Sequence, residues 1–219
     1  MWYALLRHHS FWLLTSSTSS TIIENIQEEC KTGLAILAFY YFDFRYTRKE
    51  DVRIFLSSLL MQLGVQSERL WGFLCELHST HTDGFRQPSE AELLVCLKNM
   101  LKLSGQGELY IVVDALDECE SSSGFSAPRQ RVLNIIKELV HLKVSHLHLC
   151  VTSRFEIDIQ GVLKPLKPAS VSLHDQPGQM KDIALYVKEF VESEARMGLW
   201  PEDIRNLVIR KLSEKGCGM

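Results

Sequence analysis

The stretch "LYIVVDALDEC" at residues 109–119 decides the fold class of this sequence. Five apolar or aromatic residues lead directly into Asp114, and two further acids, Asp117 and Glu118, follow within one turn. A short apolar run that is rich in β-branched residues and bounded by polar ones predicts a buried strand. We therefore expect a strand over 109–113 that presents three carboxylates at its carboxyl end.

Helical and strand patterns alternate on both sides of this stretch. Apolar residues recur at i, i+3 and i+4 in the helical segments, whereas the strand segments are short continuous apolar runs. Ser89 and Glu92 have the spacing of a capping box at the start of one helix. The predicted helices begin near Ser16, Val52, Leu70, Ser89, Val132, Ile183 and Pro201, and the predicted strands are 34–44, 109–113, 147–154 and 169–175. This alternation predicts an α/β fold with a parallel sheet covered by helices on both faces.

The composition, 46% hydrophobic and 23% charged over 219 residues, is typical of a globular domain. The formal net charge of −3 lacks the basic excess expected of a nucleic-acid-binding protein. No run approaches the roughly 20 apolar residues that span a membrane. The six cysteines have neither zinc-site spacing nor the pattern of a disulfide framework. We expect a cytoplasmic protein with reduced thiols.

The three acids fall where ligands bind in an open parallel sheet, at the carboxyl end of a strand. Phosphoryl-transfer enzymes use one such acid to hold magnesium and another to orient the attacking water. Arg154 ends the next strand, in "VTSR", and could reach the same edge to sense a γ-phosphate. An acid after a strand also caps turns in many proteins, and an arginine there can simply pair with it, so this structural alternative stays open.

Four stretches extend the pattern over most of the chain. They are "SSTIIENI" (19–26), "LAFYYFDFRYTRKEDVRIFLSSLLMQL" (37–63), "LYIVVDALDEC" (109–119) and "LHLCVTSRFEIDI" (147–159). Together they resemble a NACHT-type signalling ATPase of the STAND group, and most closely the nephrocystin-3-like N-terminal module common in fungal NACHT proteins. The resemblance implies a Mg·ATP site in which Asp114 is the magnesium acid, Glu118 orients water and Arg154 is the sensor. It also implies that Asp117 belongs to the same acidic motif and that Ser16 is a magnesium ligand.

The phosphate-binding loop of that family, G-x-x-x-x-G-K-[ST], should directly precede the helix that begins at Ser16. Its lysine would fall at Thr15, but no glycine occurs before Gly33 and no lysine before Lys31. Glycines let successive backbone N–H groups surround the phosphates, and bulky residues such as Trp12 cannot adopt that conformation without strain. We therefore expect the binding of Mg·ATP to be impaired.

The resemblance also suggests a division of the chain. Residues 1–15 form an atypical N-terminus in place of the first strand and phosphate loop, 16–175 form a NACHT- or AAA-like NTPase core, and 176–219 start a helical appendage. Both ends look truncated relative to the family. The run "WYALL" at 2–6 could stand in for the first strand, which such a sheet needs near its centre.

Three functions remain open. The favoured one is a signalling module of ATP-hydrolase ancestry that has lost catalysis. The second is a nucleotide-independent module that packs against other protein subunits, or a full-length NACHT relative, through an exposed sheet edge. The third is an active ATPase whose phosphate loop is missing only from this version of the sequence. None of the three involves nucleic acid or a membrane span.

Overall fold

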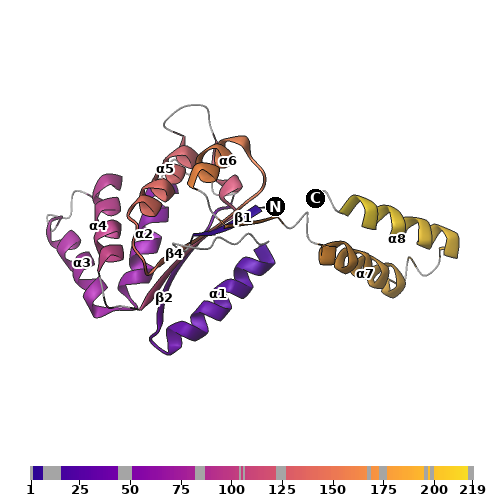
Figure 1. Cartoon of the computed structure of the whole chain (residues 1–219), viewed down its shortest axis with the longest axis horizontal. Coiled ribbons are helices and arrows are strands. Elements are labelled where there is room, and N and C mark those ends of the chain that lie inside the picture. The colour runs from indigo at the N-terminus through magenta and orange to yellow at the C-terminus, as the bar shows by residue number, and fades with distance from the viewer. Residues whose placement is uncertain are drawn as a thin grey trace. The chain divides into compact units, whose positions relative to one another are not determined.

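A computed structural model describes residues 2–6, 16–43, 51–81, 87–103, 105, 107–121, 127–166, 169–172, 177–194, 197 and 200–216 (Figure 1). The elements are β1 (Trp2–Leu6), α1 (Ser16–Lys31), β2 (Ala35–Tyr41), α2 (Asp51–Gly64), α3 (Glu68–Ser79), α4 (Glu90–Lys102), β3 (Glu108–Asp114), η1 (Leu116–Glu118), α5 (Pro128–His141), β4 (Leu147–Ser153), α6 (Ile157–Leu163), η2 (Lys164–Leu166), β5 (Ala169–Ser172), α7 (Pro177–Ser193) and α8 (Glu202–Gly216). The predicted α/β fold class is confirmed. The chain divides into two compact units, Trp2–Val171 and the residues from Ser172 onward.

The strands of the first unit form one sheet in the order β2-β3-β4-β1-β5. β2, β3 and β4 run parallel, with Leu37 opposite Tyr110 and Ile111 opposite Leu149. Most residues of β3 and all residues of β4 are buried, as expected for parallel strands that are covered on both faces. The predicted parallel arrangement therefore holds for these three strands.

β1 takes the place beside β4 that the first strand of the predicted fold needs, but it runs antiparallel to β4. Trp2 lies opposite Ser153 and Leu6 opposite Leu149, so the chain leaves β1 at the end of the sheet where β4 begins. The backbone groups of β4 gain a partner in this way. An apolar run such as "WYALL" predicts a buried strand but not its direction, and antiparallel pairing is at least as stable as parallel pairing, so a mixed sheet is compatible with this sequence.

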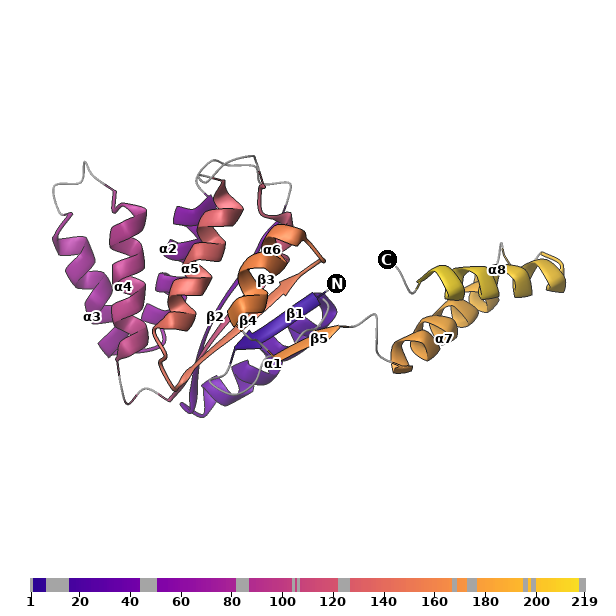
Figure 2. The same ribbon diagram turned by 45° about the horizontal axis from the view of Figure 1, so that its top comes forward.

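Helices cover both faces of the sheet, with α1 on one face and α2 and α5 on the other (Figure 2). The core under α1 consists of Ile23, Ile26, Ala35, Leu37, Val112 and Cys150. On the opposite face, the fully buried Phe55 of α2 packs edge-on against Tyr40, with 5.3 Å between ring centroids. Successive residues of each strand therefore point alternately into two cores, one on each face of the sheet.

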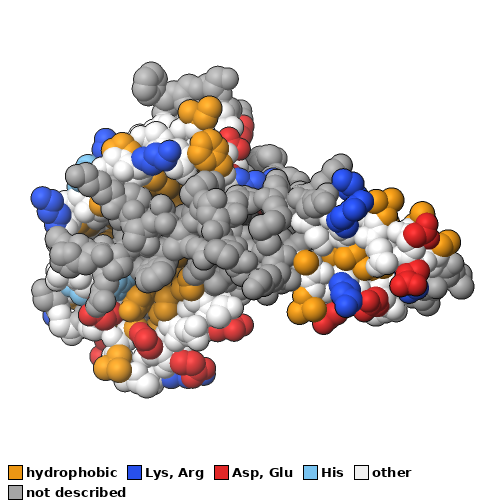
Figure 3. All heavy atoms as spheres, turned by 45° about the vertical axis from the view of Figure 1, so that its right-hand side comes forward, with side chains coloured by type: hydrophobic (Ala, Val, Ile, Leu, Met, Phe, Trp, Pro, Cys, Tyr) orange, Lys and Arg blue, Asp and Glu red, His pale blue; other side chains and the backbone are white. Residues whose placement is uncertain are grey.

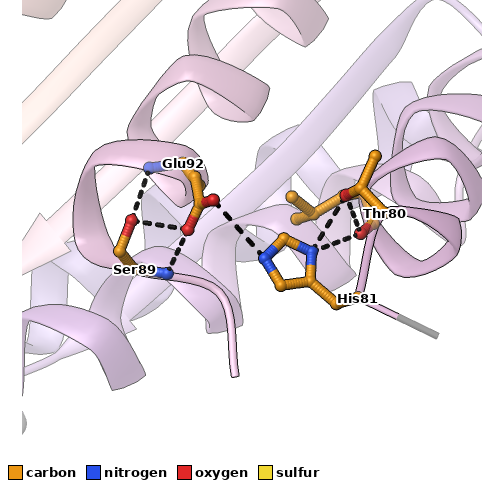
Figure 4. A network of polar contacts seen from close by, with 5 residues as sticks. Thr80, His81, Ser89 and Glu92 are labelled. Carbon is orange, nitrogen blue, oxygen red and sulfur yellow. Dashed lines mark hydrogen bonds and ion pairs between the residues drawn. The ribbon is translucent and has the colours of Figure 1, made fainter. Parts of the chain in front are cut away.

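The capping box predicted at the start of α4 is confirmed (Figure 4). The Glu92 N–H donates to Ser89 Oγ at 3.3 Å, and the Ser89 N–H donates to Glu92 Oε2 at 2.7 Å. Glu92 also lies 3.5 Å from Nε2 of His81, which follows α3. His81 Nδ1 lies 2.9 Å from both Leu77 O and Thr80 Oγ1. The capping box thus ties the end of α3 to the start of α4.

The second unit consists of α7 and α8, which pack against each other. Val191 is its fully buried residue among those described, and Tyr186 stacks on Phe190 with 6.3 Å between centroids. Hydrophobic side chains lie between charged side chains of both signs on its surface (Figure 3). In the described part of the chain, no helix combines the length and the apolar character needed to cross a bilayer.

Candidate functional site

β3 and β4 end side by side at one edge of the sheet. Their register places Val113 opposite Val151, so Asp114 and Thr152 follow as neighbours. Both point to the face that α1 covers, because they share parity with Val112 and Cys150 of the core on that face. Asp114 is 4% exposed and Thr152 1% exposed. The first predicted site residue is therefore a buried carboxylate.

Two hydroxyl groups donate hydrogen bonds to the Asp114 carboxylate. Ser19 Oγ of α1 donates to Oδ1 at 2.6 Å, and Thr152 Oγ1 donates to the same oxygen. Thr152 Oγ1 in turn accepts a hydrogen bond from the Ala115 N–H at 2.6 Å. Hydrogen bonds to charged groups each contribute about 1.5–3 kcal/mol. Asp114 thus fastens α1, β3 and β4 to one another.

The buried charge of Asp114 acts on its neighbours. Burial raises the pKa of the Cys150 thiol to about 12, and the Asp114 charge acts in the same direction. Burial also raises the pKa of Tyr41, with a further rise from Asp114 and an opposing hydrogen bond with Ser20. A second negative charge is disfavoured beside the first, which is why the Asp114 charge raises the pKa of both groups.

The backbone turns sharply after Asp114. Ala115 adopts the left-handed conformation, with φ 52° and ψ 45°, which costs a residue other than glycine about 1–2 kcal/mol. The Glu118 N–H then donates to Ala115 O at 2.9 Å and closes η1. This turn sends Asp117 to partners different from those of Asp114.

Asp117 pairs with the end of β4. Its Oδ1 accepts a hydrogen bond from the backbone N–H of Arg154 at 2.8 Å, and its Oδ2 lies 3.4 Å from Arg154 Nε. The Asp117 side chain is 6% exposed, whereas that of Arg154 is 70% exposed. The structural alternative, in which the arginine pairs with an acid of the turn, describes this contact. The guanidinium contributes little to stability because it is largely in solvent.

Arg129, in the first turn of α5, is a buried residue of the site that sequence reasoning missed. Its Nε donates to Cys119 O at 3.0 Å and its Nη2 to Asp117 O at 2.5 Å. Its Nη1 lies 3.3 Å from Asp158 Oδ2. Arg129 therefore fixes the turn that carries the acids. No residue pattern signals this role, because two of its three partners are main-chain carbonyls.

The structure brings the predicted residues together in two groups. Asp117 meets Arg154, and Asp114 meets Ser19 of α1. Glu118 is half-buried at the end of η1. Ser16 begins α1, but its side chain lies outside the described residues. Ser19 lies on the apolar stripe of α1, and this position is the sequence feature that could have predicted its burial.

The chemistry of this edge fits only half of a Mg·ATP site. Carboxylates such as Asp114 and Glu118 suit magnesium. The phosphate half does not fit, because residues 7–15 contain no glycine and no lysine. Leu6 pairs with Leu149 near the start of β4, so β1 ends at the far end of the strands from the acids. Among the described residues, no three His, Cys, Asp or Glu side chains are grouped to hold a metal ion.

Comparison with protein families gives a match that covers most of the first unit. Residues 15–154, more than half of the chain, match the family described as nephrocystin 3, N-terminal. The matched segment begins just before α1, contains the acidic turn and ends at Arg154. No curated protein matches the chain.

Proposed function

The chain belongs to the nephrocystin 3 N-terminal family, and from this premise we propose that it is the core of a NACHT-type signalling module of NTPase ancestry whose nucleotide binding is impaired. One contrast at α1 carries the proposal. Ser19 of this helix reaches Asp114 at the acidic edge, yet the residues before the helix lack the glycines and lysine of a phosphate loop. We further propose that the module acts in the cytoplasm on other protein subunits.

The acidic edge supports the ancestry. Asp114 ends β3, Glu118 follows this strand and Arg154 follows the neighbouring strand β4, as in enzymes that hold magnesium and sense phosphate at the carboxyl ends of the strands. In the ancestral site Asp114 would bind magnesium, Glu118 would orient water and Arg154 would sense the γ-phosphate. Asp117 would keep its present role as the partner of Arg154. We assign this chain no catalytic step.

Charge at the same edge opposes nucleotide binding. Three carboxylates lie within one turn, and the nearby guanidinium of Arg154 is already paired with Asp117. A polyphosphate that approaches this edge meets like charge, and a phosphate loop would normally offset that charge with its lysine and backbone N–H groups. The affinity for Mg·ATP should therefore be far below that of a working ATPase.

Thermal unfolding of the whole chain with and without millimolar Mg·ATP tests the proposal. Nucleotide at 100 times its dissociation constant would add roughly 2.7 kcal/mol to stability, which is a rise of about 5–10 °C in Tm for a domain of this size. We expect no rise. Asp114→Asn is the matched control, because an amide oxygen can still accept both hydroxyl hydrogen bonds while the charge is lost. A rise that disappears in this variant would contradict the proposal.

A further inference from the structure

β2 is an edge strand of the sheet and pairs on one side with β3. Along a strand, backbone groups point alternately toward one neighbour and toward the other. The Phe42 N–H donates to Asp114 O of β3 at 3.0 Å, so β2 residues of the same parity face β3. Leu37 and Phe39 have the other parity, and their N–H and C=O groups therefore face outward, where a further strand would pair.

Two glutamine side chains, one in α2 and one just after it, already form hydrogen bonds with these outward groups. Gln62 Oε1 accepts from the Phe39 N–H at 3.0 Å, and Gln62 Nε2 donates to Phe39 O at 2.8 Å. Gln66 Oε1 accepts from the Leu37 N–H at 3.1 Å, and Gln66 Nε2 donates to Leu37 O at 2.6 Å. Each amide makes both hydrogen bonds that one residue of an added strand would make.

The spacing of the two amides matches the spacing of the strand. Gln66 lies two residues beyond α2, but the Val65 N–H still donates to Met61 O at 3.1 Å, so the helical path continues past Gly64. Four residues on such a path rise about 6.0 Å, and two residues of a strand rise about 6.6 Å. The remaining amide hydrogens are also engaged, because Gln62 Nε2 donates to Ser58 Oγ at 3.0 Å and Gln66 Nε2 donates to Gln62 O at 2.5 Å. These bonds hold both side chains in the orientation that covers the edge.

The strand that the amides cover is one that would otherwise pair with itself. Residues 35–41, "AILAFYY", contain no charge, no proline and no glycine. Uncharged segments of high β-propensity at a sheet edge are templates for pairing with a copy of the same segment. Charged or proline residues usually prevent such pairing, and this strand has none.

We propose that Gln62 and Gln66 close the β2 edge and prevent it from pairing with the β2 edge of a second copy of this chain. The second copy is the occupant of an opened edge because two identical uncharged strands can pair antiparallel about a two-fold axis. This edge is therefore a closed surface, so a partner could add a strand at its centre only by displacing the two amides. The inference does not depend on nucleotide binding.

The Gln62→Ala/Gln66→Ala double variant of the whole chain tests the closure. In dilute solution we expect hydrogen exchange at the Leu37 and Phe39 N–H groups to become at least roughly tenfold faster than in the wild type. Sedimentation velocity should show the mass of the variant doubling as concentration rises, while the mass of the wild type stays constant. In the dimer, the two N–H groups should become protected again.

Three further variants separate the closure from general destabilisation. Gln62→Glu/Gln66→Glu keeps an acceptor for each N–H but puts two charges on the edge, so it should not dimerise. Gln130→Ala removes an α5 amide whose hydrogen bond is to Asn134, and should change neither measurement. Gln66→Ala alone should accelerate exchange at Leu37 and leave Phe39 unchanged, so the closure can be tested even if the double variant does not fold.

Two results would overturn the proposal. Unchanged exchange at Leu37 in Gln66→Ala would mean that the amide does not protect the edge. Fast exchange at both positions in a double variant that remains at the mass of the wild type would mean that the open edge has no tendency to pair with a second copy.

Discussion

At the carboxyl ends of β3 and β4, Asp114 accepts hydrogen bonds from Ser19 and Thr152, and Asp117 accepts one from the backbone of Arg154. Before α1, by contrast, β1 ends at the other end of the strands from the acids. Residues 7–15, which connect β1 to α1, contain no glycine and no lysine. The fold thus needs the acidic half of the candidate site, whereas it forms without a phosphate-binding half. The acids hold helix, strands and turn together whether or not nucleotide binds, so their presence alone is weak evidence for catalysis.

The largest effect on the acidic half should come from Thr152→Val. Valine has nearly the same shape, but it leaves the buried Ala115 N–H without an acceptor and removes one donor to the Asp114 carboxylate. We expect the free energy of unfolding to fall by about 3–4 kcal/mol, as measured by urea denaturation. A loss below about 1 kcal/mol would show that the acid is not structural and would remove the contrast between the two halves.

A smaller loss is expected for Ser19→Ala, which breaks the hydrogen bond between α1 and the acidic half. Asp114 keeps Thr152 as a donor, so the free energy of unfolding should fall by about 2 kcal/mol. Ser57→Ala, at an exposed position of α2, is the matched control and should stay within about 0.5 kcal/mol of the wild type. Equal values for the two variants would mean that α1 is held by its apolar face alone.

A pH dependence reports whether the acidic half is closed to water. The pKa of Cys150 is raised to about 12 from an ordinary value of about 9. The native state therefore holds this proton more tightly than the unfolded state does. Its contribution to stability is complete below pH 9 and is lost as the pH rises toward 12, at up to about 1.4 kcal/mol per pH unit.

Urea denaturation between pH 8 and about pH 10.5 measures this slope. Cys150→Ala is the reference, since it removes the thiol while the other titrating groups remain, including Tyr41, whose raised pKa acts in the same direction. We expect the wild type to lose stability more steeply than the variant. Equal slopes would mean that solvent enters beside Asp114, as in an open cleft.

Much of the fold could be predicted because burial leaves a periodic trace in the sequence. The strand predicted over 109–113 extends one residue further at each end in the structure, and Ser89 and Glu92 form the capping box that their spacing predicts. The short helix α6 was missed because seven residues carry too few periods to stand out. The direction of β1 could not be predicted, since an apolar run reads the same in either direction.

The candidate site was predictable only in part. The positions of Asp114 and Arg154 followed from the ends of their strands. The pairing of Asp117 with Arg154 was one of two alternatives, and sequence could not choose between them. The contact of Thr152 with Asp114 could not be predicted, because it requires the register of β3 against β4. The role of Arg129 could not be predicted either, because it bonds main-chain carbonyls that no residue pattern reveals.

Calorimetric titration of the whole chain with Mg·ATP measures nucleotide binding without relying on unfolding. We expect only heats of dilution up to millimolar nucleotide, for the wild type and for Asp114→Asn alike. Saturable binding with a micromolar Kd in the wild type that is lost in Asp114→Asn would contradict this expectation, and would show that the acids still hold nucleotide.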